Sequence, residues 1–534
     1  MTGRIFAAAA VQRLFVQLLV GLTVISVPAQ PLLAATCSVV KHNPPSEADK
    51  ALLAMDYVKA EGLYKSVLAA HPGDVDATVG LVHALLGEQK LQEAADAVKT
   101  ALAATPNSAS LLTSRGEVEF AQGEPWVVEQ TVLASYKLDP CNPRTRLLYA
   151  RFAEVNSRYA TARQQIGLAH QFDPQDPEIR AAWIDTLPLA DRVAQQEASI
   201  ADASGESADT LRQMRADLDR WKKEASEATH ACTLVSTAAP ADIPFVKLAG
   251  WAGHTRAFGM EVGLNGVSQR LQLGAGEGGI TLFRAGAEHA GLKRISASEP
   301  GGPGGKPTYS AYADSIKIGN LEFKDCAVRV VDGASPFDNG DGLIGMDVFS
   351  DFLVTLDYPM RKVQLGALPL RQAQTAAAAP SLKTASVKSD RNSLADRYVS
   401  PEMKDYTQIY RVGDNLILPA ALNAAKVKLF ILDLGAGTTS VAPEVAKDVS
   451  KVSEKDVFGH KTLVADEITF NFAHLSQKVN GVTAMDTSMA SRGTGMNISG
   501  FIGANTFSVL IMHIDYRDGL VKFEFIPDRG YKFE

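Results

Sequence analysis

The sequence predicts a multi-domain protein in which an all-α repeat solenoid precedes an all-β module made of two related lobes. Three observations predict this order. Prolines recur every 34 residues between positions 72 and 174, short alternating strands with glycine-rich turns begin near residue 238, and one strand-and-loop motif occurs twice beyond that point. The length of 534 residues suits about three or four domains. A net charge of −7 without a long basic run argues against a nucleic-acid partner.

The first 35 residues have the layout of a secretory signal peptide. Arg4 and Arg13 precede an apolar stretch at residues 14–27, which is followed by the small pair Ala34-Ala35. This stretch is too short to span a bilayer comfortably, and no other apolar run approaches about 18 residues. We therefore expect an exported protein, periplasmic or secreted, without a membrane span in the mature chain. A lipid anchor on Cys37 is the alternative.

Four cysteines remain after such a leader, and an exported chain can keep disulfides. Three pairings are open to Cys37, Cys141, Cys232 and Cys326, and the sequence does not choose between them. None of the four belongs to a Cys-x-x-Cys pair, and none has a histidine at metal-ligand spacing. Buried thiols or one structural bridge are expected, with no metal site and no cofactor.

Residues 41–200 keep the 34-residue period at several phases at once. Small or apolar residues recur at fixed offsets before each proline, which lets two helices approach closely. The prolines that end successive units are Pro72, Pro106, Pro140 and Pro174. This pattern resembles the tetratricopeptide repeat. The resemblance implies stacked helix pairs whose concave face binds a peptide or a protein partner; the alternative is an array that merely packs against the neighbouring domain. Residues 201–237 are expected to form a capping or linker helix.

Two β lobes are expected at residues 238–368 and 401–534, joined by an Ala- and Ser-rich linker at residues 369–400. The first lobe contains Leu-Gln-Leu-Gly-Ala-Gly at 271–276, and the second contains Leu-Asp-Leu-Gly-Ala-Gly at 432–437. An apolar-apolar-Gly step follows each copy and ends at Gly345 or Gly503. From these glycines to the closing Asp-Tyr pairs, the two lobes stay in register.

A strand that runs into Asp-x-Gly-Ala, an apolar-apolar-Gly step and a closing strand ending in Asp-Tyr resemble the retropepsin-like and pepsin-like aspartic peptidases. In that family each lobe gives one aspartate to a shared site, where the two carboxyl groups hold one proton between them. The ionised member activates a water, and the protonated member donates to the peptide carbonyl. The resemblance implies that Asp433 is the catalytic aspartate and that Gln272 replaces the second one. The glycines expected to shape the loops and the substrate-binding cleft are Gly274, Gly276, Gly345, Gly435, Gly437 and Gly503.

The carboxamide of Gln272 cannot exchange a proton near neutral pH. Leu273 and Leu434 also stand where the family usually has Thr or Ser, so the hydroxyl pair that locks the two loops together is missing. Three explanations remain open. Asp433 alone activates water while Gln272 polarises the carbonyl, or two chains form a homodimer that pairs their Asp433 carboxylates. In the third, the cleft between the lobes binds an extended peptide without cutting it, and the repeats recruit a protein partner.

Overall fold

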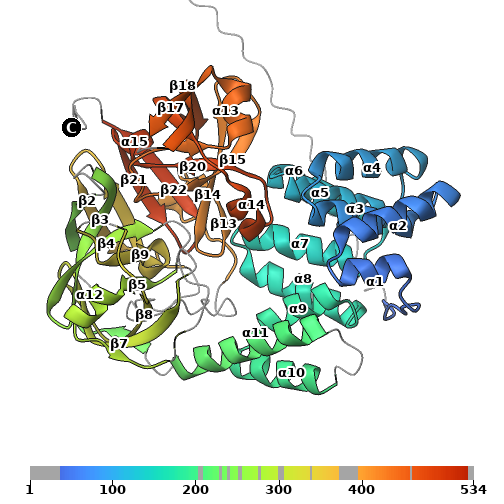
Figure 1. The fold of residues 1–534 in the computed structure, drawn as a ribbon, viewed down its shortest axis with the longest axis horizontal. Helices are drawn as coiled ribbons and strands as arrows, with labels where there is room; N and C mark the ends of the chain where they lie inside the picture. The colour runs from blue at the N-terminus through green and yellow to red at the C-terminus, as the bar shows by residue number, and fades with distance from the viewer. Residues whose placement is uncertain are drawn as a thin grey trace, which may run out of the picture. The chain divides into compact units, whose positions relative to one another are not determined.

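The computed structural model describes residues 37–202, 208–227, 231–236, 241–249, 255–274, 278–296, 298, 306–336, 339–371, 395–457 and 460–526. The predicted order, a helical repeat region followed by a strand-rich region, is confirmed (Figure 1). The expected signal peptide and residues 372–394 of the expected linker lie outside the described residues. No helix in the described part of the chain combines the length and the apolar character needed to cross a membrane.

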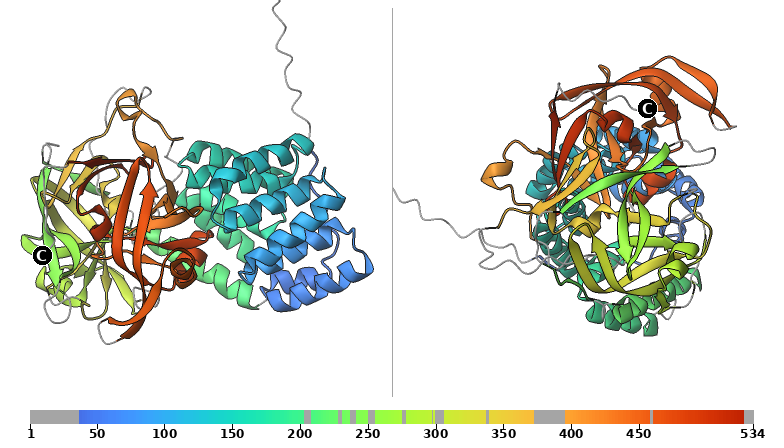
Figure 2. Two further views of the ribbon diagram at one scale, coloured as in Figure 1. Left: turned by 90° about the horizontal axis from the view of Figure 1, so that it is seen from above. Right: turned by 90° about the vertical axis from the view of Figure 1, so that its left-hand side faces the viewer.

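The repeat region is built from helices that follow one another with short turns, most of them 13 or 14 residues long and α1 and α9 shorter (Figures 1 and 2). Their bounds are α1 (Glu47–Leu53), α2 (Tyr57–Ala70), α3 (Val75–Gly87), α4 (Leu91–Ala104), α5 (Ala109–Ala121), α6 (Pro125–Leu138), α7 (Pro143–Val155), α8 (Tyr159–Phe172), α9 (Pro177–Thr186) and α10 (Leu189–Ala201). The N-cap residues of α3, α5, α7 and α9 repeat the 34-residue period as Asp74, Ser108, Asn142 and Asp176. Each cap side chain accepts a backbone N–H of its helix's first turn, which fixes where the helix begins.

Small residues allow the helices of each unit to pack closely. Ala60, Ala94, Val128 and Ala162, which share one repeat position, are all buried. After the repeats, α11 (Ala208–Glu227) packs against α10 and buries Trp221. This helix falls within residues 201–237, where a capping or linker helix is expected.

Two sheets form the strand-rich region among the described residues. The larger sheet has the order β12 (Thr407–Gln408), β22 (Leu520–Phe525), β21 (Leu510–Asp515), β10 (Phe352–Asp357), β11 (Lys362–Ala367), β2 (Ala241–Ala249), β3 (Thr255–Leu264), β4 (Val267–Gly274), β9 (Gly342–Gly345), β5 (Ile280–Phe283), β8 (Leu321–Val331), β7 (Thr308–Ile318), β6 (Lys293–Arg294). Strand β1 (Ala231–Leu234) also belongs to this sheet and pairs with β8. The smaller sheet has the order β13 (Tyr410–Val412), β14 (Asn415–Leu422), β15 (Val427–Leu432), β20 (Ile498–Ile502), β16 (Ser440–Val441), β19 (Leu475–Ala484), β18 (His460–Phe472), β17 (Val452–Val457). Short helices α12 (Arg284–His289), α13 (Pro443–Val449), α14 (Ser488–Thr494) and α15 (Ala504–Phe507) connect the strands.

The two predicted lobes share the larger sheet through their matching strands. Strand β10 of the first half pairs antiparallel with β21 of the second, and Thr355 lies opposite His513 at the centre of the ladder. These two residues are 158 positions apart, the same offset that relates Gly345 to Gly503. Equivalent residues therefore meet at the centre of this pairing, as expected where a local two-fold axis relates the halves. The Thr355 hydroxyl and His513 Nδ1 lie 2.9 Å apart there.

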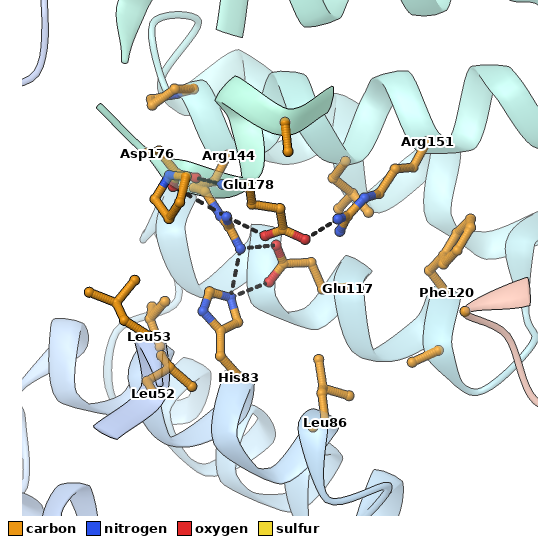
Figure 3. Close-up of a pocket in the computed structure, with 18 of the residues that line it drawn as sticks. Leu52, Leu53, His83, Leu86, Glu117, Phe120, Arg144, Arg151, Asp176 and Glu178 are labelled. Atoms are coloured by element: carbon orange, nitrogen blue, oxygen red, sulfur yellow. Dashed lines mark hydrogen bonds and ion pairs between the residues drawn. The ribbon is translucent and has the colours of Figure 1, made fainter. Parts of the chain in front are cut away.

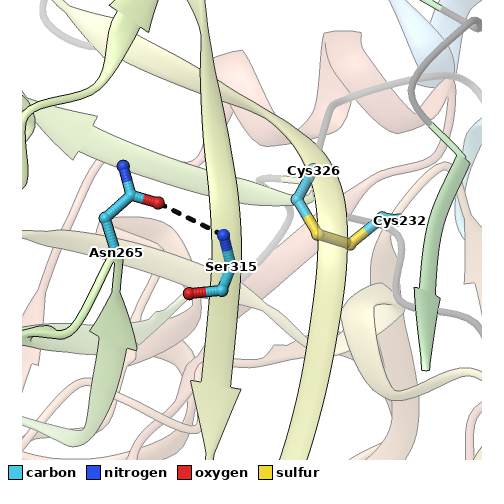
Figure 4. Close-up of a disulfide and its surroundings, with 4 residues drawn as sticks. All are labelled: Cys232, Asn265, Ser315 and Cys326. Atoms are coloured by element: carbon cyan, nitrogen blue, oxygen red, sulfur yellow. Dashed lines mark hydrogen bonds between the residues drawn. A yellow bond between two sulfur atoms is a disulfide. The ribbon is translucent and has the colours of Figure 1, made fainter. Parts of the chain in front are cut away.

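A disulfide closes the first half of the strand-rich region (Figure 4). Cys232 of β1 is bonded to Cys326 of β8, across 94 residues of sequence, and the two strands also pair side by side. Nearby, the Ser315 N–H donates to the side-chain oxygen of Asn265 over 3.2 Å. The structure thus fixes one bridge that the sequence leaves open, and because none of the described cysteines is free, the expectation of buried thiols or a single bridge is wrong.

Candidate functional site

The loop after β15 holds the one acidic residue of the duplicated motif. Strand β15 runs parallel to β20 and ends at Leu432, and the Asp433 N–H continues the ladder by donating to the Ile502 carbonyl over 3.0 Å. The chain then turns back, so that the Ala436 N–H donates to Asp433 Oδ1 over 3.0 Å. Burial raises the pKa of Asp433, and the N–H groups of Ala436 and Gly435 only partly offset this effect. The carboxyl group therefore holds its proton more tightly than an exposed aspartate.

Further hydrogen bonds brace this loop against the apolar-apolar-Gly step. The Gly503 N–H donates to Thr439 Oγ1 over 3.0 Å, and that hydroxyl in turn donates to Asn505 Oδ1 over 2.7 Å. The Ala504 N–H donates to the Ala436 carbonyl over 2.7 Å, and Gly437 lies within the loop so closed. The second loop is rigidly positioned as a result.

The first half has a different brace at the matching place. The Gly345 N–H donates to the Gly279 carbonyl over 2.9 Å. The Gly279 N–H donates to both carboxylate oxygens of Asp347, each over 3.0 Å. Backbone and carboxylate thus replace the threonine and asparagine of the second half. Gly276 lies outside the described residues.

The first half contacts the loop that carries Asp433, because the Phe258 N–H of β3 donates to the Gly435 carbonyl over 2.7 Å. A Cβ atom added to Gly435 would lie 1.9 Å from the Leu273 carbonyl oxygen and 3.0 Å from Gln272 Cγ. The Tyr358 hydroxyl donates to the Leu434 carbonyl over 3.0 Å. The side chain of Gln272 therefore lies against the loop that carries Asp433.

The strand pairing of β4 with β9 and of β15 with β20 nevertheless aligns the two halves differently from the duplicated sequence motif. Gln272 lies opposite Leu343 in β9, whereas Ile431 lies opposite the equivalent Phe501 in β20. Leu343 and Phe501 also pair on their other side, with Thr281 of β5 and Ser440 of β16 respectively. Thr281 stands nine positions after Gln272, and Ser440 stands nine positions after Ile431. Two residues beyond Ile431 stands Asp433, and two beyond Gln272 stands Gly274. In sheet register the counterpart of Asp433 is thus Gly274, which has no side chain.

A second candidate site is a groove along the helical repeats, which the sequence analysis does not locate. Its volume is about 1500 Å³, and it is lined by α1, α2, α3, α5, α7 and α9 together with the β13–β14 turn and Thr494-Gly495 (Figure 3). The rings of Tyr57 and Tyr64 line it and lie over Gly87 and Gly80, where an added Cβ would meet ring atoms within 2.7 Å. Apolar and charged side chains share its surface.

Ion pairs cross the groove between successive units (Figure 3). The Arg144 guanidinium donates to Glu178 over 2.6 Å and lies 3.5 Å from a Glu117 oxygen, while His83 Nε2 lies 2.8 Å from the other Glu117 oxygen. Arg151 pairs with Glu178 from the opposite side. Burial opposes ionisation of Glu117, but His83 and Arg144 outweigh it and lower the pKa of this carboxyl group. Arg151 and Arg144 likewise outweigh burial at Glu178 and lower its pKa, so both Glu117 and Glu178 are ionised at neutral pH.

The repeat period contains the signal that would have found these residues. One row of side chains spaced by 34 residues consists of Asp49, His83, Glu117 and Arg151. Another row consists of His42, Asp76, Ser110, Arg144 and Glu178. All of them except Ser110 line the groove. Because equivalent positions of stacked repeats lie side by side, charges that alternate along one phase predict a common surface.

The repeats also pack against the second half of the strand-rich region. Phe120, Val128 and Phe152 of the helices share one buried cluster with Ile431 and Ile498 of the smaller sheet. The Asn497 N–H donates to the Ala121 carbonyl over 2.8 Å. Both alternatives for the array are thus compatible with the structure, since it packs against its neighbour and still keeps an open groove.

Comparisons with known proteins bear on the helices. A tetratricopeptide-repeat family model matches residues 51–115. Among solved structures, the chain is similar to a thermophilic tetratricopeptide-repeat protein of Thermus thermophilus, with 17% identity over 33% of this chain and 95% of that one, at a TM-score of 0.28. The comparison with curated proteins gave no match. The helical region contains tetratricopeptide repeats, and repeats of this kind bind protein partners.

No group of three or more His, Cys, Asp or Glu side chains is placed to hold a metal ion in the part of the chain that the structure describes.

Proposed function

We propose that this chain is a protein-interaction scaffold that binds a peptide segment of its partner along the helical groove. The observation that carries this proposal is the groove itself, which is lined by both apolar and charged side chains of equivalent repeat positions. Some of its apolar residues are strongly exposed: Leu53 is 56% and Met55 is 70% exposed. Exposed apolar side chains beside ordered ion pairs are typical of a surface that is covered by a partner.

A degenerate library of 12-residue peptides, passed over the immobilised full chain, tests this proposal. We expect retention by the parent chain and by Val58→Arg, and loss of retention in Leu53→Arg. Val58 is 70% exposed and does not line the groove, so it is the matched control for Leu53. Equal retention by the two variants, or none by the parent chain, would contradict the groove as the binding surface.

For the strand-rich region we propose an aspartic-peptidase-like module that binds an extended peptide without hydrolysing it. Support comes from the sheet register, since Gly274 brings no acid to the counterpart position of Asp433. A single buried carboxyl group cannot act as both the general acid and the general base of this reaction.

A peptidase is the second candidate, and the intact loop around Asp433 with its raised pKa favours it. Its activity would need either Gln272 as the polarising group or a homodimer that pairs two Asp433 carboxylates. Digestion of the same library at pH 4 and pH 7 decides between the candidates. Cleavage by the parent chain that disappears in Asp433→Asn establishes the peptidase. If the parent is inactive, Gly274→Asp tests the register, because it places a second acid at the ladder position and Gln272→Asp does not.

We also propose that the protein is exported, to the periplasm or beyond the cell. The bond between Cys232 and Cys326 supports this location, because disulfides persist in oxidising compartments and are rare in the cytosol. Mass spectrometry of the alkylated protein from fractionated cells tests it: the mature chain should begin after residue 35 and occur outside the cytosol.

A further inference from the structure

The charges that line the helical groove are unbalanced. Eight carboxylates, from aspartates and glutamates of the repeats and of the β13–β14 turn, face three guanidinium groups. The groove therefore carries an excess of five negative charges when its two histidines are neutral. For comparison, the whole chain carries a net charge of −7, with 60 acidic and 53 basic residues, so acidic residues outnumber basic ones far more on this surface than in the chain as a whole.

The three arginines are already engaged within the protein. Arg144 pairs with Glu178, Asp176 and Glu117, and Arg151 pairs with Glu178. Arg411 is 7% exposed and lies 4.0 Å from the centre of the Tyr516 ring. Their guanidinium groups are thus directed to protein carboxylates or an aromatic ring, and they are poorly placed to attract an anionic ligand.

The row that begins at His42 shows where the excess lies. Arg144 and Glu178 compensate each other at the C-terminal end of this row, 34 residues apart. Asp76 comes two repeats before Arg144, and the position between them is occupied by the uncharged Ser110. Asp76 is exposed and lines the groove. A cation at this end of the groove would meet the Asp76 carboxylate, and the equivalent position of the next repeat holds Ser110 and no arginine that could pair with Asp76.

Apolar side chains stand at the same end. Leu53 is the last residue of α1, Met55 stands two residues later in the following turn, and both are more than half exposed. They line the groove together with Asp76 and with Asp49, whose pKa is lowered although burial opposes this, because Tyr64 and Ser46 donate to its carboxylate. An ionised carboxylate beside exposed apolar surface matches a lysine or arginine flanked by apolar residues.

We infer that the groove selects a basic peptide segment, in which lysine or arginine side chains alternate with apolar anchors, from the partner protein. This inference rests on the proposed scaffold function and specifies its ligand. The cation meets Asp76 and Asp49, and the apolar anchors cover Leu53 and Met55. Electrostatic attraction of this kind speeds association and excludes acidic segments.

Fluorescence anisotropy with three labelled 12-residue peptides tests the inference on the full chain. The first peptide carries three lysines and three leucines among serines, and in the others the lysines are replaced by glutamate or by serine. We expect the lysine peptide to bind about tenfold more tightly than the serine peptide at low salt and the glutamate peptide to bind most weakly, with the preference reduced at high salt.

Asp76→Lys and Asp96→Lys form a matched pair of variants, since both aspartates are exposed and Asp96 does not line the groove. Because both substitutions change the net charge equally, non-specific attraction falls equally in each. Asp76→Lys should weaken binding of the lysine peptide about tenfold, and Asp96→Lys by less than about twofold.

Equal affinities for the lysine and serine peptides, or equal effects of the two variants, would overturn the basic specificity. The scaffold proposal would survive that result if the degenerate library were still retained in a manner that depends on Leu53. If no peptide bound and the library were not retained either, both proposals would be wrong.

Discussion

Replacing Gly435 with alanine tests the contact between the two loops on which the candidate β site depends. The added Cβ would lie 1.9 Å from the Leu273 carbonyl oxygen, whereas a carbon–oxygen contact needs about 3.3 Å. One loop must therefore move by about 1.4 Å. Overpacking of this kind costs about 1–3 kcal/mol, and loss of the 2.7 Å bond from Phe258 to Gly435 adds about 1 kcal/mol. We expect a loss of about 2–4 kcal/mol in the free energy of unfolding.

Differential scanning calorimetry of the full chain measures this loss. The matched control is Gly62→Ala, because Gly62 lies within α2 and a Cβ there meets no atom within 4 Å. That substitution should raise stability by up to about 1 kcal/mol, since alanine favours a helix interior over glycine. If Gly435→Ala unfolds at the same temperature as the parent chain, the loops do not approach each other as described, and the proposals for the β module lose their geometric basis.

Three further outcomes are expected in the same assay. Arg144→Met should cost about 1.5–3 kcal/mol, because it removes charged hydrogen bonds to buried Glu117 and half-exposed Glu178 and leaves only His83 and Arg151 to compensate them, whereas Lys222→Met, which breaks one exposed pair, should cost about 1 kcal/mol or less; similar losses would contradict the groove network. Replacing Cys232 and Cys326 together by serine should cost about 2–4 kcal/mol, since the bond closes a loop of 94 residues, and a reducing agent should cost the parent chain at least as much, because Cys37 and Cys141 are disulfide-bonded too. Burial raises the pKa of Asp433 above its ordinary 3.8, so ionisation destabilises the native state as pH rises through that value; Asp433→Asn should then be more stable than the parent at pH 7 but not at pH 3, and a stability difference that is the same at both pH values would refute this.

The helical region could be predicted from the sequence because the 34-residue repeat indicates both where the helices end and which residues pack between them. The prolines mark helix ends, and the small residues at one phase are the ones found buried between helices. The charged groove was equally present in the sequence, in the rows that contain His83 and Arg144. The repeat is recognised from its apolar and small residues, because these are buried between neighbouring helices. The groove is formed by polar residues, which pair between neighbouring repeats, so it becomes apparent only when the 34-residue period is followed for charged residues as well.

The sheets were harder to derive because strand pairing joins residues that are far apart in sequence. The alternating pattern predicts strands near β10 and β21, yet nothing local says that they pair with each other across 158 residues. Their closing Asp-Tyr pairs suggested only that the halves are related. The central ladder from Thr355 to His513 follows from a two-fold arrangement of two halves, which a pattern within one strand cannot express.

The two-residue difference in register has a physical origin that also explains why the motif was misleading. Matching the two motifs aligns identical residue types, whereas strand pairing depends on which side chains face the buried side of the sheet. A shift of two residues along a strand keeps the same alternation of buried and exposed side chains. The spacing between each motif and the following apolar-apolar-Gly step indicates the same shift. Gln272 stands 73 residues before Gly345, whereas Asp433 stands 70 residues before Gly503, and Gly274, which stands 71 residues before Gly345, is the better match. In that register the residue equivalent to Asp433 is a glycine and not an amide. Because Gly274 has no side chain, the position equivalent to Asp433 supplies neither an acid nor a hydrogen-bonding group, and the register therefore gives a stronger reason than the sequence motif to expect no hydrolysis.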